Sequence, residues 1–314
     1  KIDKYWISKL PETDFLISKR NNSSYLINLA QSKFYIEKDN NIEWHKEYED
    51  DEDTMSLHRF DWLIRLLIEN NNNKLPTRGV DWITEWIEES QKINNDLKND
   101  SYTISERLMN LTLFFCATKK YLKLSEADLS LINKMVFNDI NHLVHNLEYV
   151  GKKTNNHIIN NARALYVVGR LSKVKFAEII GRNIIENETD RLLPEGVLNE
   201  ASSHYQLLLT RSYLEIYWFA FVTNDLMLVS FLKKRISKML NCCNDLIFEV
   251  NKKYEIPFIG DISPDYPPSL FCGYPFTLSK KYKYSPWSKI WGDFIEFEKI
   301  LPKQSTYSNN SAIT

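Results

Sequence analysis

The stretch YQLLLTRSYLEIYWFAFV, residues 205–222, contains the longest apolar segment of the sequence and predicts a long helix. Its most apolar part, residues 213–222, is far shorter than the roughly 18 apolar residues that a membrane-spanning helix needs, and no other stretch approaches that length. A helix that is apolar on most of its surface is typical of a protein interior. We therefore expect this helix to be buried in a core, and we expect no membrane span.

Apolar residues recur at spacings of three and four on both sides of this segment, which is the period of an α-helix. Further helices are expected over residues 60–67, 82–87, 103–117, 125–147, 158–168, 176–188 and 226–249. The helix at 125–147 should begin at Ser125, and Thr103 or Ser105 should cap the helix at 103–117. Helical hairpins repeated over about 250 residues are typical of a bundle, a solenoid or a toroid of helix pairs, and the lack of a clean sequence period disfavours the solenoid.

The sequence divides into three parts. Residues 1–50 combine short elements of mixed type, among them a strand-like alternation over residues 25–36. Residues 51–301 carry the helical pattern and are expected to form one helical domain. Residues 302–314 consist largely of Ser, Asn and Thr with almost no apolar residue, which is typical of a linker or tail.

Composition excludes several classes of protein. With 43% hydrophobic and 26% charged residues the chain can form a core, so it is neither disordered nor fibrous. Lys and Arg (40) balance Asp and Glu (41), and no basic run is present, so we expect no nucleic-acid partner. The four cysteines are too scattered for a disulfide framework and are expected to be small core residues.

One expected helical face could hold a metal ion, because Asp139, His142 and His145 follow one another at intervals of three residues. Histidines on the surface of a helix are the commoner outcome of this spacing. We therefore expect neither a metal nor a cofactor in this chain.

Three clusters of polar residues are candidate sites, namely residues 154–157 (TNNH), 194–205 (PEGVLNEASSHY) and 260–265 (GDISPD). Each also has a purely structural explanation, since such residues cap helices and form turns. Asn156 and Tyr205 are 49 positions apart, which allows two helices to leave and return to the same end of a bundle. An amide, an imidazole and a phenol could then converge.

These three groups together would suit β-elimination of a uronic-acid polysaccharide. The reaction removes a weakly acidic C5 proton beside a carboxylate. An amide or imidazolium donor can neutralise that carboxylate and stabilise the enolate that develops. A tyrosine hydroxyl can protonate the leaving O4 oxygen.

Several short segments occur in an order that is more specific than any one of them. They are residues 56–62 (SLHRFDW), 105–107 (SER), 145–148 (HNLE), 155–157 (NNH), 195–196 (EG), 200–205 (EASSHY) and 260–261 (GD). With them the sequence resembles the helical domain of the heparinase II/III-like polysaccharide lyases, including relatives encoded with bacterial capsule genes. The resemblance covers residues 44–261. It implies an all-α fold, an incomplete (α/α) toroid of helical hairpins, and an acidic polysaccharide such as a glycosaminoglycan as substrate.

The resemblance also implies roles for single residues. Asn156, with His157 beside it, matches the family's carboxylate-neutralising Asn, and Tyr205 matches its catalytic Tyr. Glu200 and Arg107 are expected to contact the sugar, Arg107 through the bidentate fork of its guanidinium. The other predicted substrate-binding residues are Asn155, His204, Asp261 and, as a stacking platform for a sugar ring, Trp62.

The sequence departs from the family pattern in places. Gln206 follows Tyr205 where many members have His, and Glu195-Gly196 stands where they have Asp-Gly. Members continue into a C-terminal β-sandwich that supplies a catalytic His and, in several, a zinc site, and residues 302–314 are too few to form it. We therefore expect this chain to be the helical half of such an enzyme, with a β-sandwich domain as its partner. The family resemblance implies that it works in the periplasm or outside the cell. No signal segment begins the sequence, so a cytoplasmic location also stays open.

Two other functions remain open at this point. Glu200 and Asp261 could form the acid–base pair of a glycoside hydrolase on a similar toroid. Alternatively, the polar clusters could be caps and contacts in a non-catalytic glycan-binding protein of a capsule system. The combination of Tyr205 with Asn156 favours the lyase over the hydrolase.

Overall fold

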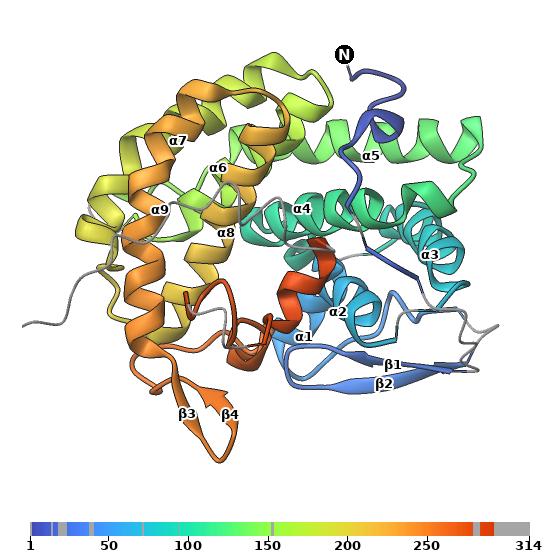
Figure 1. Cartoon of the computed structure of the whole chain (residues 1–314). Helices are drawn as coiled ribbons and strands as arrows, with labels where there is room; N and C mark the ends of the chain where they lie inside the picture. The colour runs from blue at the N-terminus through green and yellow to red at the C-terminus, as the bar shows by residue number, and fades with distance from the viewer. Residues whose placement is uncertain are drawn as a thin grey trace, which may run out of the picture.

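Helical hairpins make up most of the computed structural model, which confirms the all-α prediction (Figure 1). The structure describes residues 2–13, 15–17, 24–37, 41–70, 72–93, 95–151, 154–278 and 283–291, so the predicted tail at 302–314 lies outside the described residues. The α-helices within these ranges are α1 (Asp51–Arg59), α2 (Asp61–Asn70), α3 (Leu75–Ser90), α4 (Ser101–Thr118), α5 (Glu126–His145), α6 (His157–Leu171), α7 (Lys175–Leu192), α8 (Ser203–Val222) and α9 (Leu226–Leu246).

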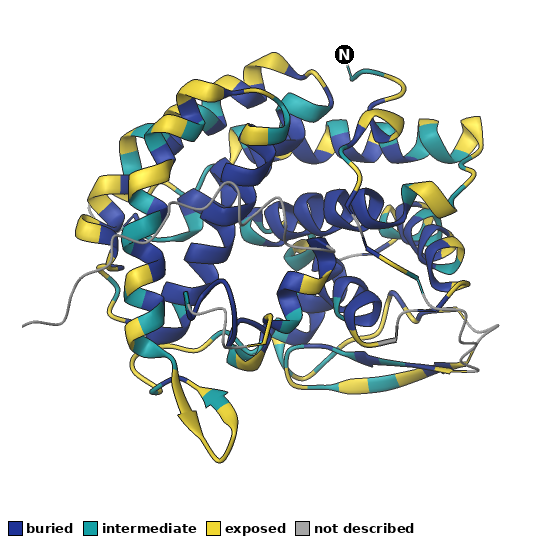
Figure 2. Cartoon of the chain, in the orientation of Figure 1, coloured by how far each residue is buried: buried dark blue, intermediate teal, exposed yellow. Residues whose placement is uncertain are grey.

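Three consecutive hairpins, α4–α5, α6–α7 and α8–α9, form two layers of helices. The first helix of each hairpin is internal, and α6 packs against both α4 and α8. Nearly every residue of α4, α6 and α8 is buried, whereas α5, α7 and α9 bury one face (Figure 2). An inner and an outer layer arranged in this way form the predicted incomplete (α/α) toroid.

Charged residues join the inner helices at their buried faces. Arg163 of α6 donates hydrogen bonds to Glu106 of α4 (2.7 Å) and to Glu215 of α8 (3.0 Å). Arg211 of α8 donates a further bond to Glu106 (2.9 Å). We call these four residues the inner ionic cluster. Each of their side chains is at most 3% exposed, so the charges can be tolerated only because they are paired.

The helix boundaries agree with the sequence in part. Ser125 caps α5 in a reciprocal capping box with Asp128, as expected from its position. The prediction for the start of α4 is wrong by a few residues. Asp100 caps this helix by accepting a hydrogen bond from the Thr103 N–H (2.9 Å), while Ser105 lies inside the helix and bonds the Ser101 carbonyl.

Two small antiparallel sheets accompany the helices. β1 (Ser24–Asn28) pairs with β2 (Lys33–Glu37), which confirms the alternation predicted there. β3 (Phe248–Val250) pairs with β4 (Lys253–Glu255) in the hairpin at the lower left of Figure 1. Because β3 begins directly after Ile247, the prediction of helix up to residue 249 is wrong: α9 ends at Leu246.

Buried aromatic rings attach the N-terminal segment to α2 and α3. Trp62 lies 6.4 Å from Trp44 and 5.7 Å from Trp82 between ring centroids, and Tyr25 meets Trp82 edge-on at 5.6 Å. The domain boundary at residue 50 stays a prediction. None of the described helices has the length and apolar content to cross a membrane. The free cysteines Cys116, Cys243 and Cys272 are buried as predicted, and Cys242 is partly exposed.

Candidate active site

A cavity of about 390 Å³ lies at the N-terminal ends of the inner helices. Tyr102 of α4, Asn156 and His157 of α6, and Tyr205 of α8 line it, each from the start of its helix. One face of α1 and the loop at residues 262–264 form the other walls. We call this cavity the helix-end pocket. Unpaired N–H groups give helix N-termini a partial positive charge, so three of them together favour a negatively charged ligand.

Asn156 is held in the helix-end pocket by Glu200. The two oxygens of the Glu200 carboxylate accept hydrogen bonds from the backbone N–H and the side-chain Nδ2 of Asn156, both at 2.7 Å. The Asn156 side chain makes no capping bond to α6. Asn155 caps the start of the helix instead, since its Oδ1 accepts a hydrogen bond from the His157 N–H at 3.1 Å. Helix capping therefore explains Asn155 but not Asn156. The Asn156 side chain, which Glu200 holds through Nδ2, can still bind a ligand with its remaining N–H.

His157 is held by a second carboxylate. Its Nδ1 bonds Glu148 Oε1 at 2.8 Å, and Asn161 Nδ2 donates to the other Glu148 oxygen at 2.8 Å. Burial by itself would lower the pKa of His157, but the hydrogen bond and charge of Glu148 outweigh it and raise that pKa above its ordinary value. The imidazole ring also lies 4.7 Å from the ring of Tyr102. His157 is thus oriented at the pocket wall, and Glu148 favours its protonated form.

We expect Glu148→Gln to lower the pKa of His157, because burial then acts without the opposing charge. The imidazolium form is present below this pKa and is lost as the pH rises through it, so the variant loses the charge at lower pH than the parent protein. NMR titration of the His157 ring measures the effect. Glu186→Gln, which removes a surface partner of Arg182, is the control and should leave the titration unchanged. An unaltered His157 titration in Glu148→Gln would contradict the assignment.

Tyr205 presents a phenol to the helix-end pocket. The backbone N–H of Tyr205 bonds the capping Ser202 hydroxyl at 2.9 Å, which fixes the first turn of α8. No described residue forms a hydrogen bond with the Tyr205 hydroxyl. Burial, followed by the charges of Asp261 and Glu200, raises the pKa of Tyr205. The side chain therefore stays protonated at neutral pH and can donate a proton.

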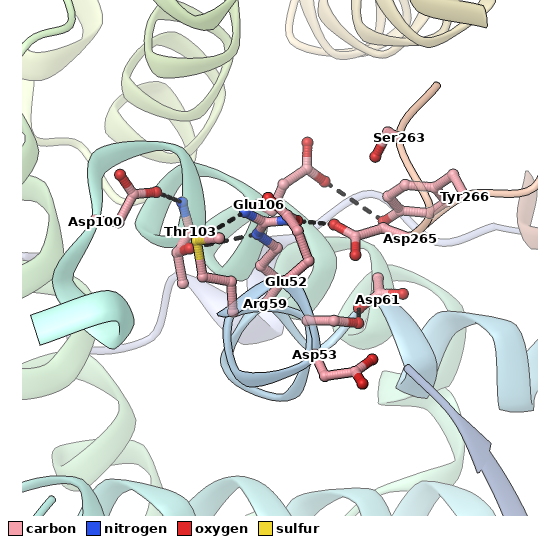
Figure 3. A network of polar contacts seen from close by, with 12 residues as sticks. Glu52, Asp53, Arg59, Asp61, Asp100, Thr103, Glu106, Ser263, Asp265 and Tyr266 are labelled. Carbon is pink, nitrogen blue, oxygen red and sulfur yellow. Dashed lines mark hydrogen bonds and ion pairs between the residues drawn. The ribbon is translucent and has the colours of Figure 1, made fainter. Parts of the chain in front are cut away.

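Arg59 of α1 lies at another wall of the helix-end pocket and is almost fully buried. It pairs with Glu52 at 2.9 Å and with Asp265, and its Nε donates to Thr103 Oγ1 at 3.3 Å (Figure 3). Its guanidinium lies 5.1 Å from the centroid of the Tyr102 ring. The two carboxylates raise the pKa of Arg59 further above its ordinary range, although burial opposes them. The guanidinium is therefore a fixed positive charge.

Two residues that were predicted to bind sugar, His204 and Asp261, do not line the helix-end pocket. His204 is completely buried, and its Nδ1 accepts the Ser263 N–H at 3.0 Å, so it positions a residue that lines the pocket. Burial lowers the pKa of His204 to about 4, which keeps it neutral. Asp261 is exposed, and its backbone carbonyl accepts a bond from Ser202 Oγ at 2.6 Å.

Arg107 and Trp62 lie away from the helix-end pocket. Arg107 forms a bidentate pair with Asp139 at 2.9 and 3.0 Å, and its guanidinium stands 4.6 Å from the centroid of Trp86. Trp62 is 0% exposed and donates its indole N–H to the Leu57 carbonyl. In this structure both residues are part of the folded core, and neither reaches the cavity that contains Asn156 and Tyr205.

Gln206, which replaces an imidazole in the family pattern, has a structural role here. Its Oε1 accepts the Leu198 N–H at 2.8 Å, and its Nε2 donates to the Gly196 carbonyl at 3.0 Å. Its side chain is buried and does not line the helix-end pocket. Gln206 therefore holds the segment before α8 from outside the pocket.

Sequence reasoning missed Arg59, Tyr102 and Glu148 as functional residues. Arg59 and Glu148 lie within the ordered segments that carried the family resemblance, and this was the available signal. Nothing local distinguishes Arg59 from Arg107, because both are arginines in helices. Which of them faces the cavity depends on partners such as Asp265, which is 206 positions from Arg59.

The residues that the structure describes contain no group of three or more His, Cys, Asp or Glu side chains placed to hold a metal ion. Asp139, a member of the face considered above, is engaged by Arg107. His145 bonds the Asn141 carbonyl at 2.7 Å through its Nδ1.

Fold and site define the class of protein: an (α/α)-toroid whose inner helices bring an amide, an imidazole and a phenol to one pocket. The family model described as heparinase II/III N-terminus matches residues 17–262, which is most of the chain. The chain belongs to this heparinase II/III family, as its ordered segments predicted. A search of curated proteins found no match.

Solved structures of lyases share the fold. A crystal structure titled heparinase III matches with a TM-score of 0.53 and 20% identity over 68% of this chain and 34% of its own. The heparan sulfate lyase HepC from Pedobacter heparinus matches with a TM-score of 0.52 and 16% identity, over 70% of this chain and 36% of its own. The present chain thus spans about a third of the length of these proteins.

Proposed function

We propose that this chain is the helical part of a polysaccharide lyase that cleaves an acidic, uronic-acid-containing polymer by β-elimination. The observation that supports this most is that Asn156, His157 and Tyr205 line the same cavity although they come from two helices. The surrounding helix N-termini add positive potential, which suits a chain of carboxylates.

In this proposal Asn156 and His157 bind the carboxylate of the uronic acid. Glu200 accepts one hydrogen bond from the Asn156 backbone N–H and one from its Nδ2, which leaves the second Nδ2 hydrogen free to donate. Glu148 favours the protonated form of His157, whose Nε2–H can donate as well. Two donors on one carboxylate would neutralise its charge and stabilise the enolate that forms when the C5 proton leaves.

Tyr205 then protonates the leaving O4 oxygen, and its raised pKa ensures that the phenol still carries the proton for this step. The same raised pKa disfavours a resting phenolate. In a syn-elimination Tyr205 would act as base and acid in turn. In an anti-elimination the base would be a His from a C-terminal β-sandwich domain, as the family resemblance implies. The scheme uses side chains only and calls for no cofactor in this chain.

Heparan sulfate is the first substrate to test, because a structural relative is named as a heparan sulfate lyase. Any lyase of this kind would meet its polymer in the periplasm or outside the cell, where we place this protein. Since the chain spans about a third of its solved relatives, we further propose that a β-sandwich domain completes the active site.

The deciding experiment measures ultraviolet absorbance during incubation with heparan sulfate, hyaluronan and alginate. Both the 314-residue chain and a version extended by a heparinase-type β-sandwich should be tested. A rise from the conjugated unsaturated uronate would support the lyase and identify its substrate. A rise in the extended version alone would place half of the active site in the other domain. No rise in either version, with each polymer intact, would refute the proposal.

The two alternative functions receive less support. Both oxygens of Glu200 are occupied by Asn156, and neither Glu200 nor Asp261 lines the helix-end pocket, which does not favour an acid–base pair of a hydrolase. New reducing ends without absorbance would nevertheless reveal a hydrolase. Saturable glycan binding with no change in chain length would reveal a binding protein.

A further inference from the structure

Asn160 is a polar residue of the helix-end pocket that the scheme above does not use. It lies on α6 and its side chain is 3% exposed. Within the described part of the chain, neither its Nδ2 nor its Oδ1 has a hydrogen-bond partner. Asn161, the next residue along the same helix, is equally buried but bonds Glu148 and Ser105. Of the described residues that have an unpaired buried polar atom, Asn160 alone has two.

The position of Asn160 relative to Asn156 matches the scale of a sugar. The Asn160 N–H bonds the Asn156 carbonyl, so the two residues are one helical turn apart on the same face of α6. Side chains at this spacing are about 5–6 Å apart between their Cβ atoms. Two substituents of one pyranose, or of neighbouring rings, are separated by a similar distance. A carboxylate bound at Asn156 would place another part of the same ligand at Asn160.

The chemistry of an unpaired carboxamide restricts what that part of the ligand can be. Burying an amide without partners is unfavourable for both its donor and its acceptor. A carboxylate or sulfate could accept from Nδ2 but would leave Oδ1 unpaired, and an ammonium group would do the reverse. Only a neutral group that both donates and accepts hydrogen bonds satisfies the two atoms together.

We propose that Asn160 is a substrate-binding residue that recognises such a neutral donor–acceptor group, an acetamido or a hydroxyl substituent, next to the carboxylate held by Asn156. This inference rests on the proposed function, since it takes the ligand to be an acidic sugar chain. Leu208 and Leu209 of α8 also line the pocket and offer an apolar surface for the carbon atoms of the group.

The first test is thermal stability, with Asn160→Leu compared with Asn161→Leu. Leucine has nearly the shape of asparagine and needs no hydrogen bonds. We expect Asn160→Leu to leave the melting temperature unchanged or raise it by about 2 °C, because it removes an unpaired buried amide. Asn161→Leu, which breaks paired hydrogen bonds, should lower it by about 4 °C or more. A drop in Asn160→Leu as large as that in Asn161→Leu would mean that the amide has a partner in the fold, and would overturn the proposal.

The second test is calorimetric titration of the full chain in a Tyr205→Phe background, which prevents turnover. The ligands are a tetrasaccharide of uronate and N-acetylglucosamine of the heparan type, and an alginate tetrasaccharide, whose neutral substituents are hydroxyl groups only. We expect Asn160→Leu to raise Kd about tenfold or more. A loss confined to the first ligand identifies an acetamido group, and a loss on both identifies a hydroxyl.

Failure of the inference is distinguishable from failure of the proposed function. Equal Kd values with and without Asn160→Leu would overturn the role of Asn160, while binding and cleavage by the parent chain would leave the lyase proposal standing. If the parent chain neither binds these ligands nor cleaves any polymer of the absorbance test, alone or extended, both proposals are wrong.

Discussion

Tyr205→Phe is expected to lower kcat by about 10²- to 10⁴-fold while leaving the affinity for the acidic polymer nearly unchanged. The substitution removes only the hydroxyl, and the loss of a general acid has an effect of this size. The ring still fills its place at the start of α8, since Tyr205 is held there by the bond from its backbone N–H to Ser202. Absorbance assays for kcat and calorimetry for Kd measure the two quantities separately, in whichever length of chain turns over.

Tyr149→Phe is the matched control for this substitution. Its hydroxyl bonds Glu188 at 3.3 Å, and the residue does not line the helix-end pocket. Its turnover should equal that of the parent protein. If Tyr205→Phe retained more than a tenth of the parent kcat, Tyr205 would not be the proton donor.

The second large effect is expected on stability. Glu106→Gln should reduce the free energy of unfolding by about 3–5 kcal/mol, because it leaves the buried guanidiniums of Arg163 and Arg211 without their shared carboxylate. A loss of this size is a large part of the total stability of an ordinary protein. Urea unfolding followed by circular dichroism measures it. Glu126→Gln, which removes an exposed partner of Lys4, should change stability by less than about 1 kcal/mol.

The pH dependence of this loss has a definite sign. Burial alone would raise the pKa of Glu106, but the charges of Arg163 and Arg211 outweigh it and hold the pKa at about 2. A carboxyl with a lowered pKa stabilises the folded state above its unfolded pKa, which is near 4.5, and this stabilisation disappears as the pH falls through the folded pKa. The difference between parent and variant should therefore be constant from pH 7 to about 5 and should shrink between pH 4.5 and 2. An equal difference at pH 7 and pH 2 would contradict the ionic account of the cluster.

The helices and their pairing were predictable from the sequence. Periodic apolar residues locate most of the helices, because burial of one helical face repeats every three to four residues whatever the partner is. Ser125 marks the start of α5 for a local reason, since its hydroxyl and the Asp128 carboxylate satisfy each other's backbone N–H groups. The 49 positions between Asn156 and Tyr205 allow both residues to lie at the same end of the fold. In the structure both line the helix-end pocket.

Other features depend on contacts between distant segments. The Asn155 and Asn156 side chains are chemically identical and adjacent in sequence, yet one caps α6 and the other binds Glu200, 44 positions away. Arg107 and Arg59 differ in the same way, because Asp139 holds the first within the core and Asp265 holds the second at the pocket. By sequence alone, Trp62 is a candidate for stacking on a sugar ring. In the fold, its ring packs between Trp44 and Trp82.

The sequence by itself thus determined the all-α class, the helical hairpins, the family and the residue types of the site, since these follow from local periodicity, local capping and short ordered segments. Only the tertiary structure decided which helices are internal, which arginine faces the cavity, and that Asn160 is buried there without a partner. The physical reason is that most polar side chains in a core are satisfied by another group, and an exception such as Asn160 is visible only when all its neighbours are known. That group is supplied by a segment tens to hundreds of residues away, and local sequence does not record its position.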